Sequence, residues 1–105
     1  MKIVIVHHHV LPGLHEAARA RIGEVTRRMS SQQGLMFRHV GMRDGMPDCL
    51  SSVTGWRSEQ DCATWEAYRD TLPPIDGEAP YAKVEELAVL VTSPDSRERG
   101  PTDGE

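Results

Sequence analysis

The sequence has little of what identifies many enzymes and binding proteins directly. Its 105 residues include two cysteines and five aromatic side chains (one Phe, two Trp and two Tyr), and its formal net charge is −4. This charge argues against a nucleic-acid partner, because phosphate binding relies on a clustered basic surface. The first ten residues hold too short an apolar run for a signal peptide or a membrane span, so we expect a cytoplasmic protein with no membrane partner.

Motifs for common cofactors are also missing. The sequence has no Gly-rich phosphate loop, no GxGxxG and no nucleophile elbow, which argues against a nucleotide or flavin site. Cys49 and Cys62 stand at no metal-ligand spacing, and we expect both to be free thiols that pack as small hydrophobic residues. No cofactor is therefore expected, although a metal ion or haem stays open as an alternative.

Hydrophobic periodicity predicts four strands and two helices. A β-branched run near the start suits a buried strand, and apolar residues at intervals of three and four then predict an amphipathic helix. The Asp44-Gly45 pair predicts a hairpin, and Ser58 with Asp61 predicts a helix N-cap. The expected strands are 2–10, 35–43, 49–56 and 84–91, and the expected helices are 14–29 and 58–72. Residues 93–105 contain no apolar side chain and predict a disordered tail after a domain at 1–92.

The order βαββαβ predicts an α+β, ferredoxin-like fold, an antiparallel sheet with both helices on one face. The other face would then be bare, and the alternation of side chains along a strand suggests which residues line it. These are Val4, Val6, Met36, Val40 and Val53. Because an exposed apolar sheet is unfavourable for a monomer, we expect a homodimer in which two sheets pack face to face as a dimeric α+β barrel.

Three consecutive histidines interrupt the first predicted strand. Alternation places His7 and His9 on one face and His8 on the other, where a structural role is expected. His39 is expected beside His7 and His9, and we predict that these three border a pocket between sheet and helices. Three interpretations stay open: a general base, a facial metal site, or histidines that are hydrogen-bonded and inert.

The segment Trp56-Arg57-Ser58-Glu59-Gln60, followed by Trp65, resembles a known pattern. It is similar to the W-E-S-x-x-A-x-x-x-[HW] segment of the antibiotic biosynthesis monooxygenase family, which are small dimeric α+β barrels. The element order and Gly34 before the second strand fit that family over about residues 1–92. Four aromatic residues, Phe37, Trp56, Trp65 and Tyr68, are expected to converge on the pocket, where they would either bind a flat aromatic ligand or simply form core.

The resemblance also implies site residues, and the sequence departs from several of them. The haem-degrading members have an Asn on the first strand, near His7 here, and a Trp that Trp65 matches. Their iron-ligating His falls near Ile75, and no histidine follows His39. In the anthrone-oxidising members an Asn and a Tyr flank the strand-end Trp. Here Trp56 is retained, whereas Ser52 stands in place of that Asn and Cys62 in place of that Tyr, which implies an altered substrate or chemistry.

The leading hypothesis is a cofactor-independent monooxygenase that oxidises a small aromatic or polyketide-derived phenol, anthrone or quinol in secondary metabolism. His7, His9 or His39 would be the base. The expected substrate-binding residues are Phe37, Ser52, Trp56, Trp65 and Tyr68. The alternatives are a polyketide cyclase or isomerase, a metal- or haem-binding protein with His7, His9 and His39 as candidate ligands, and a non-catalytic ligand-binding dimer.

Overall fold

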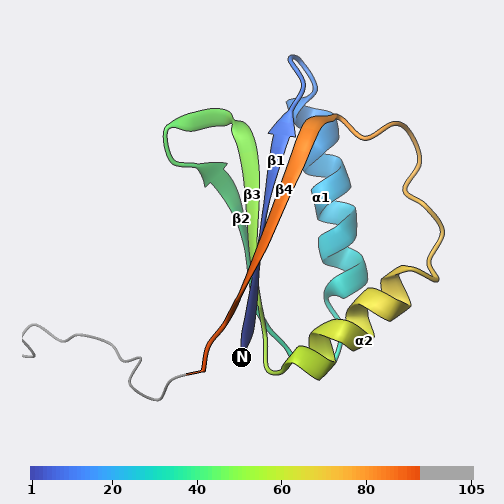
Figure 1. Ribbon diagram of the computed structural model, residues 1–105. Helices are drawn as coiled ribbons and strands as arrows, with labels where there is room; N and C mark the ends of the chain where they lie inside the picture. Colours follow the sequence, from blue (N-terminus) through green and yellow to red (C-terminus); the bar gives the residue numbers. More distant parts are fainter. Residues whose placement is uncertain (93–105) are drawn as a thin grey trace, which may run out of the picture.

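The structure, a computed structural model, describes residues 1–92 and has the predicted order of elements (Figure 1). The elements are β1 (Lys2–Val10), α1 (His15–Met29), β2 (Leu35–Arg43), β3 (Met46–Trp56), α2 (Glu59–Arg69) and β4 (Tyr81–Leu90). The tail predicted for 93–105 lies outside the described residues. No helix within residues 1–92 is long and apolar enough to cross a membrane.

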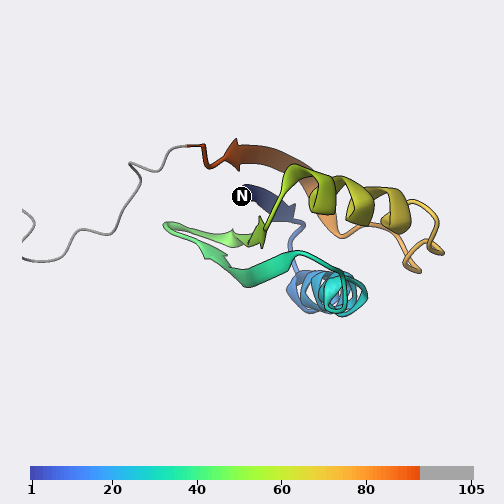
Figure 2. The same ribbon diagram turned by 90° about the horizontal axis from the view of Figure 1, so that it is seen from below.

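The four strands form one sheet in the order β2-β3-β1-β4, and each neighbouring pair is antiparallel. Both helices lie on the same side of this sheet, as the two views in Figures 1 and 2 show. The ferredoxin-like α+β fold is therefore confirmed. We call the side under α1 and α2 the helix-covered face and the opposite side the helix-free face.

Two strands begin earlier than predicted. The turn at Asp44-Gly45 is tight, with Gly45 at φ +74°, so that β3 starts at Met46 rather than at residue 49. Pro47 is tolerated there because it lies beyond Cys49, the last residue of β3 that pairs with β1. β4 starts at Tyr81 because this residue pairs with Val10 across a register shift.

The start of α2 confirms the predicted cap, and its end is earlier than expected. The Asp61 amide donates to the Ser58 hydroxyl at 3.1 Å, while the Asp61 carboxylate pairs with Arg57 at 3.2 Å. That carboxylate also occupies the space that a Cβ on Gly34 would need, and Gly34 has φ +86°. α2 stops at Arg69, before the predicted residue 72, and irregular turns lead into Pro73.

The side-chain alternation of the sheet is the reverse of the prediction. The core on the helix-covered face consists of two clusters: Val10, Ala18, Ile22 and Leu50, and Met29, Trp56, Cys62 and Trp65. Val4 packs against the second cluster, and Val6 and Val40 face the helices as well, so their predicted place on the helix-free face is wrong. Met36 lies at a register shift in β2 and is exposed, whereas Val53 takes its predicted place.

The helix-free face is nevertheless apolar, as predicted, but it is built from other residues. Strand pairing aligns on it Ile3 with Gly55 and Val89, and Ile5 with Val53 and Leu87. Phe37 covers Gly55 from the neighbouring strand β2. Leu87 and Val89 are 45% and 47% exposed, so no part of residues 1–92 covers this apolar surface.

Candidate functional site

A cavity of about 400 Å³ lies between the helix-covered face and the two helices. Its apolar wall includes Val4, Val6, Val25, Trp56, Trp65 and Tyr81. Its polar and charged groups include His8, Ser52, Thr54, Arg21, Arg38, Arg69, Glu66 and Glu86. A space of this size that combines apolar walls with convergent polar groups is typical of a site for a small organic ligand.

His8 points into this cavity from β1. Its Nδ1 bonds to the Leu50 carbonyl oxygen at 3.1 Å, which requires that Nδ1 carry the proton in the neutral ring. Its ring lies 4.8 Å from the Tyr81 ring, centroid to centroid. Burial lowers the pKa of His8 below its ordinary 6.5, and the nearby charge of Arg38 lowers it further, although the bond to Leu50 opposes this. His8 is therefore neutral at pH 7, with the Nε2 lone pair available to accept a proton.

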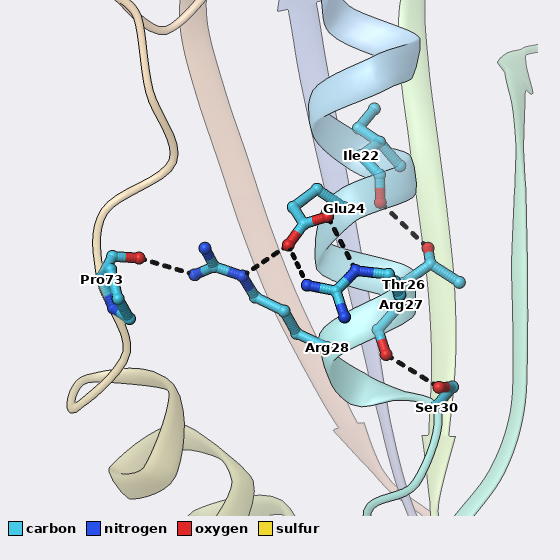
Figure 3. Close-up of polar contacts among 7 residues, drawn as sticks. All are labelled: Ile22, Glu24, Thr26, Arg27, Arg28, Ser30 and Pro73. Carbon is cyan, nitrogen blue, oxygen red and sulfur yellow. Dashed lines mark hydrogen bonds and ion pairs between the residues drawn. The ribbon is translucent and has the colours of Figure 1, made fainter.

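Arg38 is the fixed cation of the cavity. Its Nε donates to the Thr26 hydroxyl at 2.8 Å, and its Nη1 donates to the Thr54 hydroxyl at 2.7 Å. The Thr26 hydroxyl in turn donates to the Ile22 carbonyl at 3.0 Å, drawn in Figure 3. Burial lowers the pKa of Arg38, but an arginine stays charged at neutral pH. These bonds fix the guanidinium between α1 and β3.

Of the five predicted substrate-binding residues, three line the cavity. Trp56 and Trp65 are both buried, with ring centroids 6.5 Å apart and planes inclined by 20°, and Ser52 is buried opposite Val6. Tyr68 packs on the outside of Trp65 at 6.3 Å and is 45% exposed. Tyr81, which lies before the predicted start of the last strand at residue 84, takes the place in the cavity wall that was expected of Tyr68.

The predicted place of His7, His9, His39 and Phe37 in this cavity is wrong, because all four lie on the helix-free face. The His7 Nδ1 and the Ser51 hydroxyl form a hydrogen bond of 2.6 Å, and the His9 Nε2 bonds to the Glu85 carboxylate at 2.5 Å. His39 stacks on Phe37 with ring centroids 5.6 Å apart. Of the three histidines in the run, it is the one expected to be structural, His8, that reaches the cavity.

Metal-binding groups do not gather within residues 1–92. The structure brings together no set of three or more His, Cys, Asp or Glu side chains that could hold a metal ion there, and His7, His9 and His39 form no such set. Cys49 and Cys62 are buried free thiols, as expected. Burial raises the pKa of Cys62, which keeps this thiol protonated.

The loop between α2 and β4 closes one side of the cavity and is attached to α1. The Arg28 Nη1 donates to the Pro73 carbonyl at 2.8 Å, and the Arg28 Nε donates to the Glu24 carboxylate at 3.0 Å (Figure 3). Arg21 reaches the Gly77 carbonyl at 3.5 Å. Glu24 thus positions Arg28, and Arg28 holds the loop beside the helix.

Sequence reasoning missed several residues of the cavity, and those with polar groups include His8, Arg21, Arg38 and Tyr81. The sequence holds one local signal for the face of β3 that the helices cover. Trp56 leads directly into α2, so Trp56 and Thr54, two residues before it, face the helices. The face of β1 then depends on its pairing with β3, which aligns Val4 with Thr54, and this long-range register has no local signal.

Comparison by sequence gives no relatives: no family model and no curated protein matches the chain. Comparison by structure gives several similar proteins. A candidate antibiotic biosynthesis monooxygenase from Nitrosomonas europaea is similar over 89% of this chain and 100% of its own, with 16% identity and a TM-score of 0.68. The heme-degrader MhuD from Mycobacterium tuberculosis, with two hemes bound in its active site, is similar over 89% and 97%, with 14% identity and a TM-score of 0.69.

A third protein, a candidate antibiotic biosynthesis monooxygenase from Deinococcus radiodurans, is similar over 93% of this chain and 99% of its own, with 9% identity and a TM-score of 0.69. These likenesses run over nearly the whole length of each neighbour, and identities this low establish the fold alone. The resemblance carried by Trp56 to Trp65 is confirmed at that level. The chain has the fold of the antibiotic biosynthesis monooxygenases.

Proposed function

We propose that the protein oxidises a small, electron-rich aromatic compound, such as a phenol, anthrone or quinol, with dioxygen and without a cofactor. The observation that carries this proposal is His8. Its neutral imidazole has a free Nε2 lone pair in an apolar cavity walled by Trp56 and Trp65. The fold supports the reaction type, and a polyketide-derived substrate of secondary metabolism is the finer proposal that the resemblance suggests.

The chemistry needs only a base, dioxygen and a dry pocket. With an anthrone as substrate, His8 takes a proton from the activated CH₂ group, and the resulting carbanion passes one electron to dioxygen. The substrate radical and superoxide combine into a peroxide anion on that carbon, which takes up a proton to become a hydroperoxide. Loss of the second C–H proton and cleavage of the O–O bond then give a carbonyl group and water. One dioxygen is consumed, with one oxygen atom in the product and one in water.

The residues present do not fit the haem arrangement that the resemblance implies. The position of the iron-ligating histidine falls near Ile75, whose side chain has no donor atom and does not line the cavity. The one imidazole in the cavity wall, His8, comes from the sheet, and its Nδ1 is bound to a backbone carbonyl.

His8 would serve a polyketide cyclase or isomerase equally well, because both reactions begin with removal of a C–H proton. The two candidates differ in their need for dioxygen. A cyclase or isomerase would convert its substrate under anaerobic conditions, whereas the oxidation would stop. His7, His9 and His39 could act as a general base or as metal ligands only for a ligand bound on the helix-free face.

We further propose that a second copy of the chain covers the helix-free face. Ile3, Ile5, Val53, Leu87 and Val89 share this face by strand pairing, and Phe37 adds an aromatic ring. A continuous apolar sheet surface is unfavourable in water, and an identical surface offers a matching shape. His7 and His9 would then lie at the dimer interface with Ser51 and Glu85 as partners already in place.

Oxygen consumption tests the proposed reaction. The full-length protein is mixed with a dihydroxyanthrone in an oxygen-electrode cell, and anthraquinone formation is followed by absorbance, with and without a chelator. We expect one dioxygen consumed per quinone formed, at a rate that the chelator leaves unchanged. A rate no higher than the spontaneous oxidation would reject the proposed activity on this substrate class, and product formed without dioxygen would favour the cyclase or isomerase.

A further inference from the structure

Arg38 is a half-buried cation that has no anionic partner in the part of the chain that the structure describes. Its guanidinium binds two hydroxyl groups, those of Thr26 and Thr54, and within residues 1–92 it pairs with no carboxylate. Charged side chains removed from water are normally paired, because an unpaired charge loses its hydration without compensation. The Nη2 group of Arg38 makes no hydrogen bond to the described residues. This arrangement leaves a fixed positive charge at the cavity wall with the capacity to bind an anion.

A second arginine, Arg21 from α1, lines the same cavity. Burial raises the pKa of Tyr81, which the charge of Arg21 opposes, and burial lowers the pKa of His8, which the charge of Arg38 lowers further. The Tyr81 and His8 rings lie in contact, which joins the two pairs into one group. Arg21 makes a single long bond of 3.5 Å, to the Gly77 carbonyl, so that its guanidinium is available to a ligand.

The cavity wall also holds two carboxylates and a third arginine: Glu66, Glu86 and Arg69. Glu86 stands on β4, which is the opposite edge strand of the sheet from β2, where Arg38 stands. Glu66 and Arg69 come from α2. Among residues 1–92 neither carboxylate forms an ion pair with Arg21 or Arg38. Both arginines can therefore attract an anion that enters the cavity.

We propose that the ligand of this cavity is an aromatic acid. Its ring would lie against Val4, Val6 and Trp65, and its carboxylate would bind Arg38 with the help of Arg21. A guanidinium fork matches the planar carboxylate, and charge-assisted hydrogen bonds of this kind are stronger than neutral ones. The inference rests on the proposed function only in taking this cavity as the binding site, and it names Arg38 and Arg21 as the specificity-determining residues.

A role limited to the reaction itself would give a different result. If Arg38 served only to stabilise negative charge that develops during turnover, neutral and acidic ligands of one shape would bind the resting protein equally. Ground-state affinity for a matched pair of ligands therefore separates recognition of an acid from assistance to the chemistry.

The probes are 2-naphthoate and 2-naphthamide, which share a ring system and differ in charge. Titration calorimetry on the full-length protein should give a dissociation constant for naphthoate at least about tenfold lower than for naphthamide, since hydrogen bonds between charged groups have that strength. Arg38→Gln should bring the two constants close together, Arg38→Lys should retain part of the difference, and Arg21→Gln should reduce it. Because Arg38 connects α1 to β3, its variants are first checked for folding by circular dichroism; Arg21→Gln tests the same site without that connection.

Arg27→Gln is the matched control. It removes the same charge from α1, but Arg27 is exposed, pairs with Glu24 and lies outside the cavity. Equal affinity of the wild-type protein for the two probes would overturn the proposal, and so would a loss of preference in Arg27→Gln as large as in Arg21→Gln. A retained preference for naphthoate in a protein that fails the oxygen-consumption assay would reject the proposed oxidation and leave the acid site standing.

Discussion

On the helix-covered face of the sheet, polar side chains surround a cavity, whereas on the helix-free face they bind one another. His8 and Arg38 each keep one nitrogen group free toward the cavity. On the other face His7 is bonded to Ser51, and His9 to Glu85. Three adjacent histidines of one strand are thus divided between two environments. One environment has free polar atoms and apolar walls suited to a ligand, and the other has satisfied polar pairs in an apolar surface suited to a second sheet.

The largest expected effect contrasts His8 with its neighbour on the other face. His8→Gln should lower kcat for anthrone oxidation by about 10²–10⁴-fold, the usual contribution of a positioned base. His7→Gln should change kcat little, because His7 lies outside the cavity. Steady-state oxygen uptake by both variants at matched folded concentration measures the contrast.

The pH profile of the wild-type protein sharpens the same contrast. Burial lowers the pKa of His8, and a base works only when it is neutral, so kcat should rise with pH through a midpoint below 6.5 and then level off. His7→Gln should raise this midpoint only slightly, because the charge of His7 is the smallest of the causes that lower the pKa of His8. If His8→Gln retained the wild-type rate while His7→Gln lost it, the base would belong to the helix-free face.

The next effect concerns the oligomeric state and uses two positions on β4. Leu87 faces the helix-free side and Val84 the cavity, and the two are 45% and 50% exposed. Leu87→Lys would place an unpaired charge between two sheets, which costs about 3–5 kcal/mol, and should raise the dimer dissociation constant more than about 100-fold. Val84→Lys should leave it unchanged. Sedimentation velocity at micromolar concentration gives both values, and a monomeric wild-type protein would reject the proposed dimer.

The comparison of the two faces also explains what the sequence could and could not predict. Short-range chemistry was decisive at Ser58, whose hydroxyl caps α2, and at Asp44-Gly45, whose turn starts β3. These signals involve residues a few positions apart. Together with hydrophobic periodicity they predicted the order of elements and hence the fold.

No short-range signal in the sequence indicates which face of β1 the helices cover. Ile3 and Ile5 on one face are as apolar as Val4 and Val6 on the other, so that alternation alone cannot tell which face the helices cover. A shift of one residue in the pairing of β1 exchanges the side chains on its two faces. The predicted alternation is reversed in this way, so it places His7 and His9 in the cavity and His8 outside it. Tyr81 was missed for a related reason, since its strand position depends on pairing with Val10.

A smaller effect is expected at two glycines with opposite surroundings. A Cβ on Gly55 would overlap the Phe37 ring, so Gly55→Ala should displace this ring on the helix-free face at a cost of about 1–3 kcal/mol. Gly23, on α1, has open space where a Cβ would stand, and Gly23→Ala should stabilise the helix by up to about 1 kcal/mol. The urea unfolding midpoint should fall in Gly55→Ala and rise in Gly23→Ala relative to wild type. Equal shifts of the midpoint in the two variants would refute the packing of Phe37 on Gly55.

The smallest effect belongs to the ion cluster that holds the loop over the cavity. Hydrogen bonds from Arg27 and Arg28 lower the pKa of Glu24 from its ordinary 4.5 to about 2. Since the folded protein favours the ionised form, the stabilisation by Glu24 is present above pH 4.5 and is lost as the pH falls toward 2. Glu24→Gln should therefore lower the unfolding midpoint at pH 7 slightly, and the difference from wild type should shrink between pH 4.5 and 2. Glu24 is exposed to solvent screening, so the change stays small.

Glu78→Gln, in the loop and without an ion pair among the described residues, is the control. A difference between Glu24→Gln and wild type that stayed constant down to pH 2 would show that the Arg28 contact with Pro73 does not depend on the charge of Glu24.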